Sequence, residues 1–133
     1  MVSCVFCAIA KGLSEAHVIY KDSDFIAFLD KYPVTRGHTL IATIEHYVNI
    51  LDIPDEKVAR AFTLAKKIAL AQTLGLGAKG VKIVMHNNRE AGQEIMHAHI
   101  HVIPYGVPAR NRATLTREEG EEVARILREA LSQ

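Results

Sequence analysis

His97-Ala98-His99-Ile100-His101-Val102-Ile103 is the stretch of sequence that constrains the fold most strongly. Successive side chains of a β-strand point to opposite faces of a sheet, so the three histidines would share one face and the apolar residues the other. Histidines two residues apart would lie about 6.5 to 7 Å from each other, close enough to converge on one phosphate or one metal ion. Because strands do not favour histidine, this spacing indicates a chemical site rather than three solvent-facing or hydrogen-bonded histidines.

The rest of the chain supplies the elements around this strand. Runs of β-favouring residues separated by turn-forming residues predict five strands, at residues 17–20, 25–29, 38–42, 81–85 and 95–103. Apolar residues spaced by three and four predict a helix from Pro54 to Gly75, with acidic residues in its first turn. Thr116-Arg117-Glu118-Glu119 has the pattern of a capping box and predicts a second helix. Five strands and two helices sharing one core define an α+β fold.

Composition restricts the class of protein. A chain of 133 residues is long enough for one domain to bury a core, and 49% hydrophobic with 23% charged residues exclude a disordered or fibrous protein. The formal charge is +1 without a basic tract, which argues against nucleic-acid binding by charge. No apolar run reaches the roughly 18 to 20 residues that span a bilayer, and the N-terminus lacks a basic leader. We therefore expect a cytoplasmic protein without a membrane segment.

Cys4 and Cys7 form a C-x-x-C pair in a chain that has seven histidines. In a reducing compartment such a pair is more typical of metal or redox chemistry than of a structural disulfide. Two thiolates supply half of a tetrahedral zinc site, and histidines are left to complete it, although spacing does not say which two. The alternatives are a thioredoxin-like redox pair, which needs a βαβ context absent from this pattern, and two inert buried thiols.

Taken together, these motifs resemble those of the histidine-triad family of nucleotide hydrolases and transferases. The motifs that carry the resemblance are Ala91-Gly92-Gln93 before His97-x-His99-x-His101, Cys4-x-x-Cys7, Phe28-Leu29-Asp30, and Gly37-His38-Thr39-Leu40 ahead of His46. The resemblance implies one domain at residues 1–133, with a family core at 1–105 and a C-terminal extension with a helix at 106–133. It also implies a five-stranded antiparallel sheet that is extended in a homodimer.

The resemblance assigns the phosphorus chemistry to the histidine strand. His99 would form the covalent bond to phosphorus, and His101 would contact the phosphate and help to move the proton. A neutral imidazole is a competent nucleophile near neutral pH, and its bond to phosphorus is labile enough to be hydrolysed afterwards. Gln93 would join them as a catalytic hydrogen-bond donor. Further phosphate contacts are expected from Gly92, from His38, and from either Asn87 or Asn88.

The nucleoside and the metal are assigned by the same resemblance. Asp30 would accept hydrogen bonds from the ribose hydroxyls, and Phe28 and Leu29 would form apolar walls for the base. The alternative for Asp30 is that it only ends a strand before the following turn. The zinc-bearing branch of the family places structural zinc on four residues, namely Cys4, Cys7, His46 and His97.

The predicted function is hydrolysis or transfer of a purine nucleotide at its α-phosphorus through a nucleotidyl-histidine, with adenosine phosphoramidates as substrates. The alternatives are a dinucleoside polyphosphate hydrolase and a zinc-stabilised nucleotide-binding or adaptor module with little turnover. A metal set of His97, His99 and His101 is disfavoured by the long central helix and the loop before the histidines. Glu94 stands where family members carry a hydroxyl residue, and its carboxylate would either repel phosphate or act as an acid.

Overall fold

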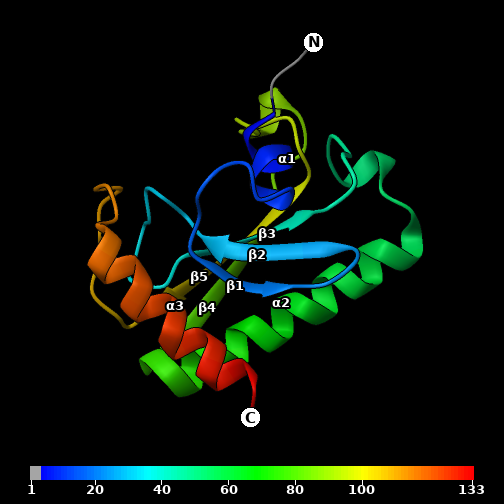
Figure 1. The fold of residues 1–133 in the computed structure, drawn as a ribbon. Coiled ribbons are helices and arrows are strands. Elements are labelled where there is room, and N and C mark those ends of the chain that lie inside the picture. Colours follow the sequence, from blue (N-terminus) through cyan, green and yellow to red (C-terminus); the bar gives the residue numbers. More distant parts are fainter. Residues whose placement is uncertain (1–3) are drawn as a thin grey trace.

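The computed structural model describes residues 4–133, so residues 1–3 of the predicted domain lie outside it. Its centre is an antiparallel sheet with strand order β1-β2-β3-β5-β4 (Figure 1). The strands are β1 Val18–Lys21, β2 Phe25–Leu29, β3 Thr39–Thr43, β4 Gly80–Val84 and β5 His99–Tyr105. The helices are α1 Val5–Ala10, α2 Asp55–Leu76 and α3 Arg117–Leu131, with short 3-10 turns η1 Ile50–Asp52 and η2 Arg89–Ala91. The α+β class predicted from the sequence is therefore confirmed.

Each face of the sheet buries its own hydrophobic cluster. On one face, α2 and α3 pack side by side over residues that include Ile41, Ile100 and Val102 (Figure 1). On the other face, α1 covers a smaller cluster that includes Phe28 and Leu40. The period-two alternation of the strands produces this division, and it sets the face on which each functional side chain lies.

Helix α2 follows the predicted pattern with a shift of one residue at each end. Asp55 and Glu56 occupy the first turn, where they complement the helix dipole, and Gly77 ends the helix with a left-handed φ of 72°. Phe62, one of the apolar residues at helical spacing, is 38% exposed. Gln72 is fully buried instead, and its Nε2 donates to the carbonyl oxygens of Gly37 and Val102. This amide therefore ties α2 to the sheet.

Two local predictions need correction. The strand predicted at 95–103 runs from His99 to Tyr105, because the Ala98 N–H leaves the ladder and donates to the Tyr47 carbonyl at 2.7 Å. The N-terminal stretch around Cys4, where the sequence pattern predicts no helix, contains helix α1, with Cys4 as its N-cap residue. The six residues of α1 are too few to show a helical period.

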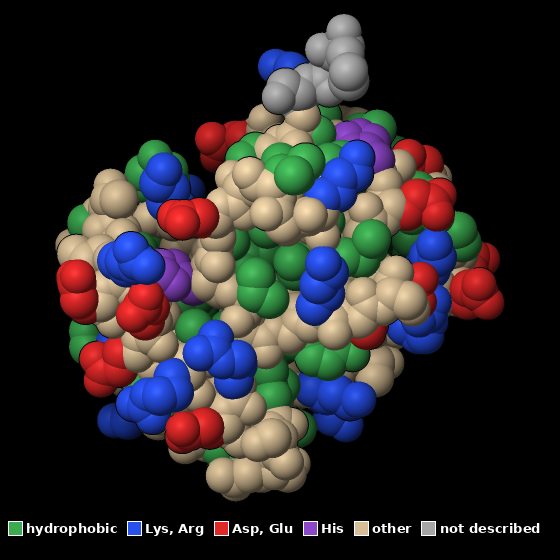
Figure 2. All heavy atoms as spheres, in the orientation of Figure 1, with side chains coloured by type: hydrophobic (Ala, Val, Ile, Leu, Met, Phe, Trp, Pro, Cys, Tyr) green, Lys and Arg blue, Asp and Glu red, His purple; other side chains and the backbone are tan. Residues whose placement is uncertain are grey.

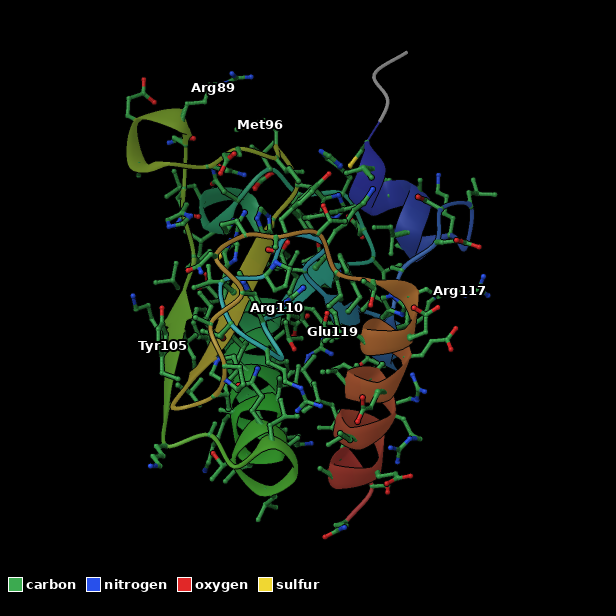
Figure 3. The ribbon with its side chains drawn as sticks, turned by 90° about the vertical axis from the view of Figure 1, so that its left-hand side faces the viewer. Arg89, Met96, Tyr105, Arg110, Arg117 and Glu119 are labelled. Carbon is green, nitrogen blue, oxygen red and sulfur yellow. The ribbon has the colours of Figure 1, made fainter. Side chains whose placement is uncertain are left out.

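Thr116 caps α3, since its side chain accepts from the Glu119 N–H. The reciprocal half of the expected capping box does not form, because the Glu119 carboxylate pairs with Arg110 at 3.0 Å (Figure 3). Helix α3 also packs closely on β1 and on His17, the residue before this strand. A Cβ atom at Gly120 would lie 2.2 Å from His17 Nε2. Helix α3 belongs to the main core, because its Val123, Ala124 and Leu127 are buried in the same cluster as α2.

The surface carries charges of both signs. On the face drawn in Figure 2, Lys and Arg side chains are interspersed with Asp and Glu side chains. This distribution agrees with the formal charge of +1. Within residues 4–133, none of the helices combines the length and the apolar character that a membrane span requires.

Candidate active site and metal-binding group

Cys4, Cys7, His46 and His97 bring one donor atom each to within 4.8 Å of one another. Cys4 Sγ lies 3.2 Å from His97 Nδ1, and Cys7 Sγ lies 3.2 Å from His46 Nδ1. Around a tetrahedral zinc ion, with Zn–S of about 2.3 Å and Zn–N of about 2.0–2.1 Å, neighbouring donors are about 3.3 to 3.8 Å apart. The geometry and the chemistry of this donor set therefore fit zinc.

Local structure orients these donors. Cys4 and Cys7 are three residues apart at the start of α1, so both side chains lie on one helix face. Buried His97 interacts through Nε2 with the Thr43 carbonyl at 2.7 Å, which places the proton on Nε2 and leaves the Nδ1 lone pair facing the thiols. Desolvation and the interaction with Cys4 raise the pKa of the Cys7 thiol. The Nδ1 atoms of His46 and His97 lie beside the two sulfur atoms and complete a set of four donors. The donor set therefore favours a metal clip over the redox alternative.

The backbone carbonyl of His97 sets the tautomer of His99. Its Nδ1 lies 2.6 Å from the His97 carbonyl oxygen, so Nδ1 carries the proton and Nε2 keeps its lone pair. The ring is packed edge-on by Phe6, with centroids 5.0 Å apart, and lies 5.1 Å from the His101 ring. Burial lowers the pKa of His99 and favours the neutral ring, while the His97 carbonyl opposes this shift. The neutral His99 ring thus presents an unprotonated Nε2 atom.

A chain of hydrogen bonds sets the tautomer of His101, which is opposite to that of His99. The Val34 N–H donates to His38 Nδ1 at 3.0 Å, so the His38 proton sits on Nε2. His38 Nε2 then donates to His101 Nδ1 at 3.0 Å, which leaves an N–H at His101 Nε2. Burial lowers the pKa of His38 to about 4 and that of His101 to about 3, so both rings are neutral at pH 7. His101 is therefore a hydrogen-bond donor beside the His99 lone pair.

The same hydrogen bonds argue against two other groups of side chains as metal-binding sites. Asp30, His38 and His101 bring donor atoms within 4.8 Å, but the proton on His38 Nε2 makes this group a hydrogen-bond relay. His97 and His99 direct their Nδ1 atoms to Cys4 and to the His97 carbonyl, respectively. The Nδ1 atoms of His97 and His99 therefore point to different partners and do not converge with His101 on one position.

Gln93 is buried in the loop before the histidines, and its amide is fully engaged there. Nε2 donates to the carbonyl oxygens of Val48 and Ile95 at 2.6 and 2.9 Å. Oε1 accepts from the Asn88 N–H and from Asn49 Nδ2. In this arrangement the Gln93 amide has no donor left for a phosphate, in contrast to its predicted role. Gln93 instead fixes the loop that precedes His97.

The other loop residues are also held by local bonds. Asn87 Oδ1 accepts from the Ile50 N–H, and Asn88 Oδ1 accepts from Asn49 Nδ2, both at 2.9 Å. Gly92 is exposed and adopts a φ of 96°, a left-handed conformation that suits glycine, while Arg89 projects outward from η2 (Figure 3). Glu94 is exposed, and its negative charge favours the protonated form of His99.

The predicted nucleoside residues divide between the two faces of the sheet. Phe28 lies in the α1 cluster, where its ring contacts Phe6 edge-on with centroids 5.4 Å apart. Leu29 lies on the opposite face in the α2 cluster, so the prediction that it lines a wall with Phe28 is wrong. Asp30 Oδ1 accepts from the Tyr32 N–H, as a turn residue does, while Oδ2 lies 3.4 Å from His38 Nε2. Asp30 therefore acts as a turn residue through Oδ1, while its Oδ2 atom faces the histidine cluster.

Three neighbours of the site were missed in the sequence. Phe6 lies inside the C-x-x-C motif, where cysteine spacing drew the attention, and packs on His97 and His99. The His86 ring lies 5.5 Å from that of His101. Arg112 Nη1 lies 3.6 Å from Asp30 Oδ2, although 82 positions separate the two residues in the chain numbering. His86 could have been found from its place beside Asn87, whereas no sequence signal links Arg112 to Asp30.

An antiparallel sheet that carries a cluster of neutral imidazoles at the end of an inner strand defines a histidine-triad domain. Comparison with protein families agrees, because the HIT domain model matches residues 11–106. The chain belongs to the HIT family. An uncharacterized HIT-like protein of Mycobacterium tuberculosis is 38% identical over 139 aligned residues, which cover 98% of this chain and 94% of that protein.

Solved structures extend the similarity to the whole fold. A hypothetical histidine triad nucleotide-binding protein from Sulfolobus tokodaii has a TM-score of 0.91 and 32% identity, over 97% of this chain and 92% of that one. A zinc-bound histidine triad family protein from Mycobacterium smegmatis has a TM-score of 0.88 and 41% identity, over 98% and 94% of the two chains. The recognition of the family from its sequence motifs is confirmed.

Proposed function

We propose that this protein hydrolyses or transfers purine nucleotides at the α-phosphorus, with adenosine phosphoramidates as substrates. The observation that carries the proposal is the 2.6 Å contact between His99 Nδ1 and the His97 carbonyl oxygen. It leaves the Nε2 lone pair of a half-buried, neutral imidazole as the nucleophile. The nucleotide-binding name of the Sulfolobus relative supports a nucleotide as the ligand.

In the first step, His99 Nε2 forms a bond to phosphorus while the bond from phosphorus to the leaving amine breaks. The amine departs with the bonding electron pair and takes up one proton. The His99 ring becomes positively charged, and the His97 carbonyl that accepts the Nδ1–H stabilises this charge. In the second step, water forms the new phosphorus–oxygen bond, the bond to His99 breaks, and one proton is released. The two steps together therefore balance in protons and restore neutral His99.

His101 contributes the N–H on its Nε2 atom. A neutral His101 that lost this proton would become an imidazolate, because His38 holds only one proton and uses it in the bond to His101 Nδ1. We therefore assign to His101 a hydrogen bond to a phosphoryl oxygen rather than proton transfer. Such a donor stabilises charge that develops on the oxygen in the transition state.

The nucleoside would lie beside these histidines. Phe6 and Phe28 are buried rings next to His99, and we propose that they form the apolar wall for a purine base. Asp30 Oδ2 faces His38 and is the acceptor proposed for the ribose hydroxyls. Gln93 acts as a positioning residue, because all of its bonds hold the loop that leads into the histidines.

We further propose that Cys4, Cys7, His46 and His97 hold structural zinc. The donor separations support this, and so does the zinc-bound relative from Mycobacterium smegmatis. Zinc would supply a fixed crosslink between α1 and the segment before β5. His97 would thereby be held by its ring while its carbonyl orients His99.

The proposed partner is a second copy of the chain, joined along strand β4. The sheet has two edges, β1 and β4. The β1 edge is covered by α3, from which Arg128 donates to the Val18 carbonyl. The β4 edge carries Ile83, which is 40% exposed, and an edge strand of this kind is a template for pairing with another chain.

The proposed function is tested with adenosine 5′-phosphoramidate and the His99→Ala variant. The wild type should release AMP, and the variant should lose at least about 10³-fold in turnover, because it lacks the nucleophile. AMP affinity should change little, since the variant leaves the Ile100 and Val102 core face intact. Nucleotide binding by the wild type without turnover would identify a binding module instead of an enzyme.

A further inference from the structure

The chain beyond the family match folds back onto the proposed nucleotide site. The HIT domain match ends at residue 106, and the loop that follows runs beside the segment connecting Asp30 to His38. Four backbone bonds pin it there: Arg36 N–H to Pro108 O, Arg110 N–H to Val34 O, Arg112 N–H to Pro33 O, and Leu115 N–H to Lys31 O, at 2.9 to 3.0 Å. These bonds therefore hold the loop in a defined position at the Asp30 end of the site.

Arg112 is presented by an unusual backbone conformation. Asn111 and Arg112 have φ angles of 51° and 63°, a left-handed conformation that costs a non-glycine residue free energy. Strain of this kind tends to gather at functional sites. The loop is also tied to the start of α3, since Arg110 pairs with Glu119 at 3.0 Å (Figure 3). From this loop the Arg112 guanidinium reaches Asp30.

The contact joins two side chains of very different exposure. Arg112 Nη1 lies 3.6 Å from Asp30 Oδ2, and the two side chains are 50% and 10% exposed. At a separation of 3.6 Å and with the guanidinium half in solvent, this ion pair is screened and contributes little to stability. Arg112 is half exposed, whereas Asp30 lies beside His38 in the site. The guanidinium therefore contacts the Asp30 carboxylate from its solvent side.

We propose that Arg112 is a binding residue for the ribose end of the nucleotide, acting together with Asp30. The inference rests on the proposed function and deepens it. A ribose hydroxyl both donates and accepts, whereas an ionised carboxylate only accepts. Asp30 Oδ1 is already used by the Tyr32 N–H, which leaves Oδ2 as the acceptor for one hydroxyl. The Arg112 N–H groups supply the donors that Asp30 lacks, so the pair matches a cis-diol.

His38 does not replace Arg112 in this role. Its Nε2 proton is directed to His101 at 3.0 Å, and its longer separation from Asp30 Oδ2 is 3.4 Å. Burial and the positive charge of Arg112 lower the pKa of His38, so the His38 ring is neutral and Arg112 carries the charge at this end.

The test compares the affinities of AMP, 2′-deoxy-AMP and 3′-deoxy-AMP for the wild type and for Arg112→Gln. The matched control is Arg117→Gln, which removes the same charge from an arginine on α3 that is 79% exposed and pairs with Glu121. Wild type and control should favour AMP over at least one deoxy form by about tenfold, as expected for a lost hydrogen bond to a charged group. In Arg112→Gln this ratio should fall to about threefold or less.

Each other outcome has a defined meaning. A wild-type ratio that survives in Arg112→Gln overturns the inference, and so does an equal loss of affinity for all three nucleotides. Arg112→Lys should recover only part of the ratio, because lysine keeps the charge but lacks the planar set of donors. If Arg112→Gln fails to fold, Arg112→Asn, which tolerates the left-handed backbone, takes its place. A wild type that binds no nucleotide at all would refute the proposed function itself, which is a separate result.

Discussion

At the scale of single residues, His99 and His101 are chemically identical side chains with opposite hydrogen-bonding states. A carbonyl oxygen holds a proton on Nδ1 of His99, whereas His38 donates to Nδ1 of His101. The first ring therefore presents a lone pair and the second presents an N–H. Sequence spacing predicts that the two rings are neighbours, but the tautomers follow from partners as distant as Val34, which the spacing does not identify.

The low pKa of His38 predicts a pH-dependent loss of stability. In the unfolded chain His38 takes up a proton near its ordinary pKa of 6.5, but in the folded protein only near 4. The unfolded state therefore binds more protons between these values, so stability is complete above pH 6.5 and falls as the pH drops toward 4. The shift corresponds to about 3 kcal/mol.

The check is urea unfolding of the wild type and His38→Gln at pH 7 and pH 4, with chelator present throughout. The wild type should lose about 3 kcal/mol more than the variant between the two pH values. Equal losses would show that His38 is protonated alike in the folded and unfolded chains. The comparison cancels the contributions of titrating groups that lie away from His38.

At the scale of elements, the regular patterns were predictable and the irregular segments were not. Strands β1, β2 and β4 and helix α2 lie within one or two residues of their predicted bounds, because each shows a clear period or turn residues at its ends. The apolar pattern before His99 predicts strand, but the bond from Ala98 to the Tyr47 carbonyl is a tertiary contact that the pattern does not contain. The motif Phe28-Leu29-Asp30 suggests one functional unit, but strand alternation places Phe28 and Leu29 on opposite faces.

The proposed zinc crosslink predicts that α1 depends on metal. One zinc per chain is expected by elemental analysis, and the double variant Cys4→Ser, Cys7→Ser should contain none. The variant should melt about 5 °C or more below the wild type, because structural zinc contributes directly to folding free energy. Chelator should lower the melting temperature of the wild type and leave that of the variant unchanged. A chelator effect of equal size on both proteins would contradict the assignment of these ligands.

The packing of α3 gives a second prediction at this scale. Gly120→Ala places a methyl group 2.2 Å from His17 Nε2, so the ring must move or α3 must shift. Overpacking of this kind costs about 1 to 3 kcal/mol. Adding His17→Ala should restore most of the stability lost in Gly120→Ala, measured by denaturant unfolding. A double variant no more stable than Gly120→Ala would show that another contact limits α3.

At the scale of the whole molecule, the C-terminal extension ties the family core together. Helix α3 joins α2 in the main core, and the loop before it places Arg112 beside Asp30. Family motifs in the sequence predict the core and most of the histidine cluster. They carry no information on Arg112, because its place depends on the loop beyond the family match.

The proposed homodimer is a property of the same scale. Wild-type protein should have about twice the mass of one chain in light scattering after gel filtration. Ile83→Lys places a charge on the exposed face of the β4 edge and should shift the protein to monomer while its fold is retained. Lys82→Ala, on the same strand, is the matched control and should remain dimeric. A wild-type monomer at all concentrations would contradict pairing along β4.

The central claim is that His99 forms a covalent bond to the α-phosphorus, and stereochemistry at phosphorus tests it most directly. A phosphorus-chiral phosphoramidate of adenosine is hydrolysed in isotopically labelled water, and the configuration of the product is determined. Two successive in-line displacements, first by His99 Nε2 and then by water, predict overall retention of configuration. Inversion would show a single direct attack by water and would contradict the role of His99.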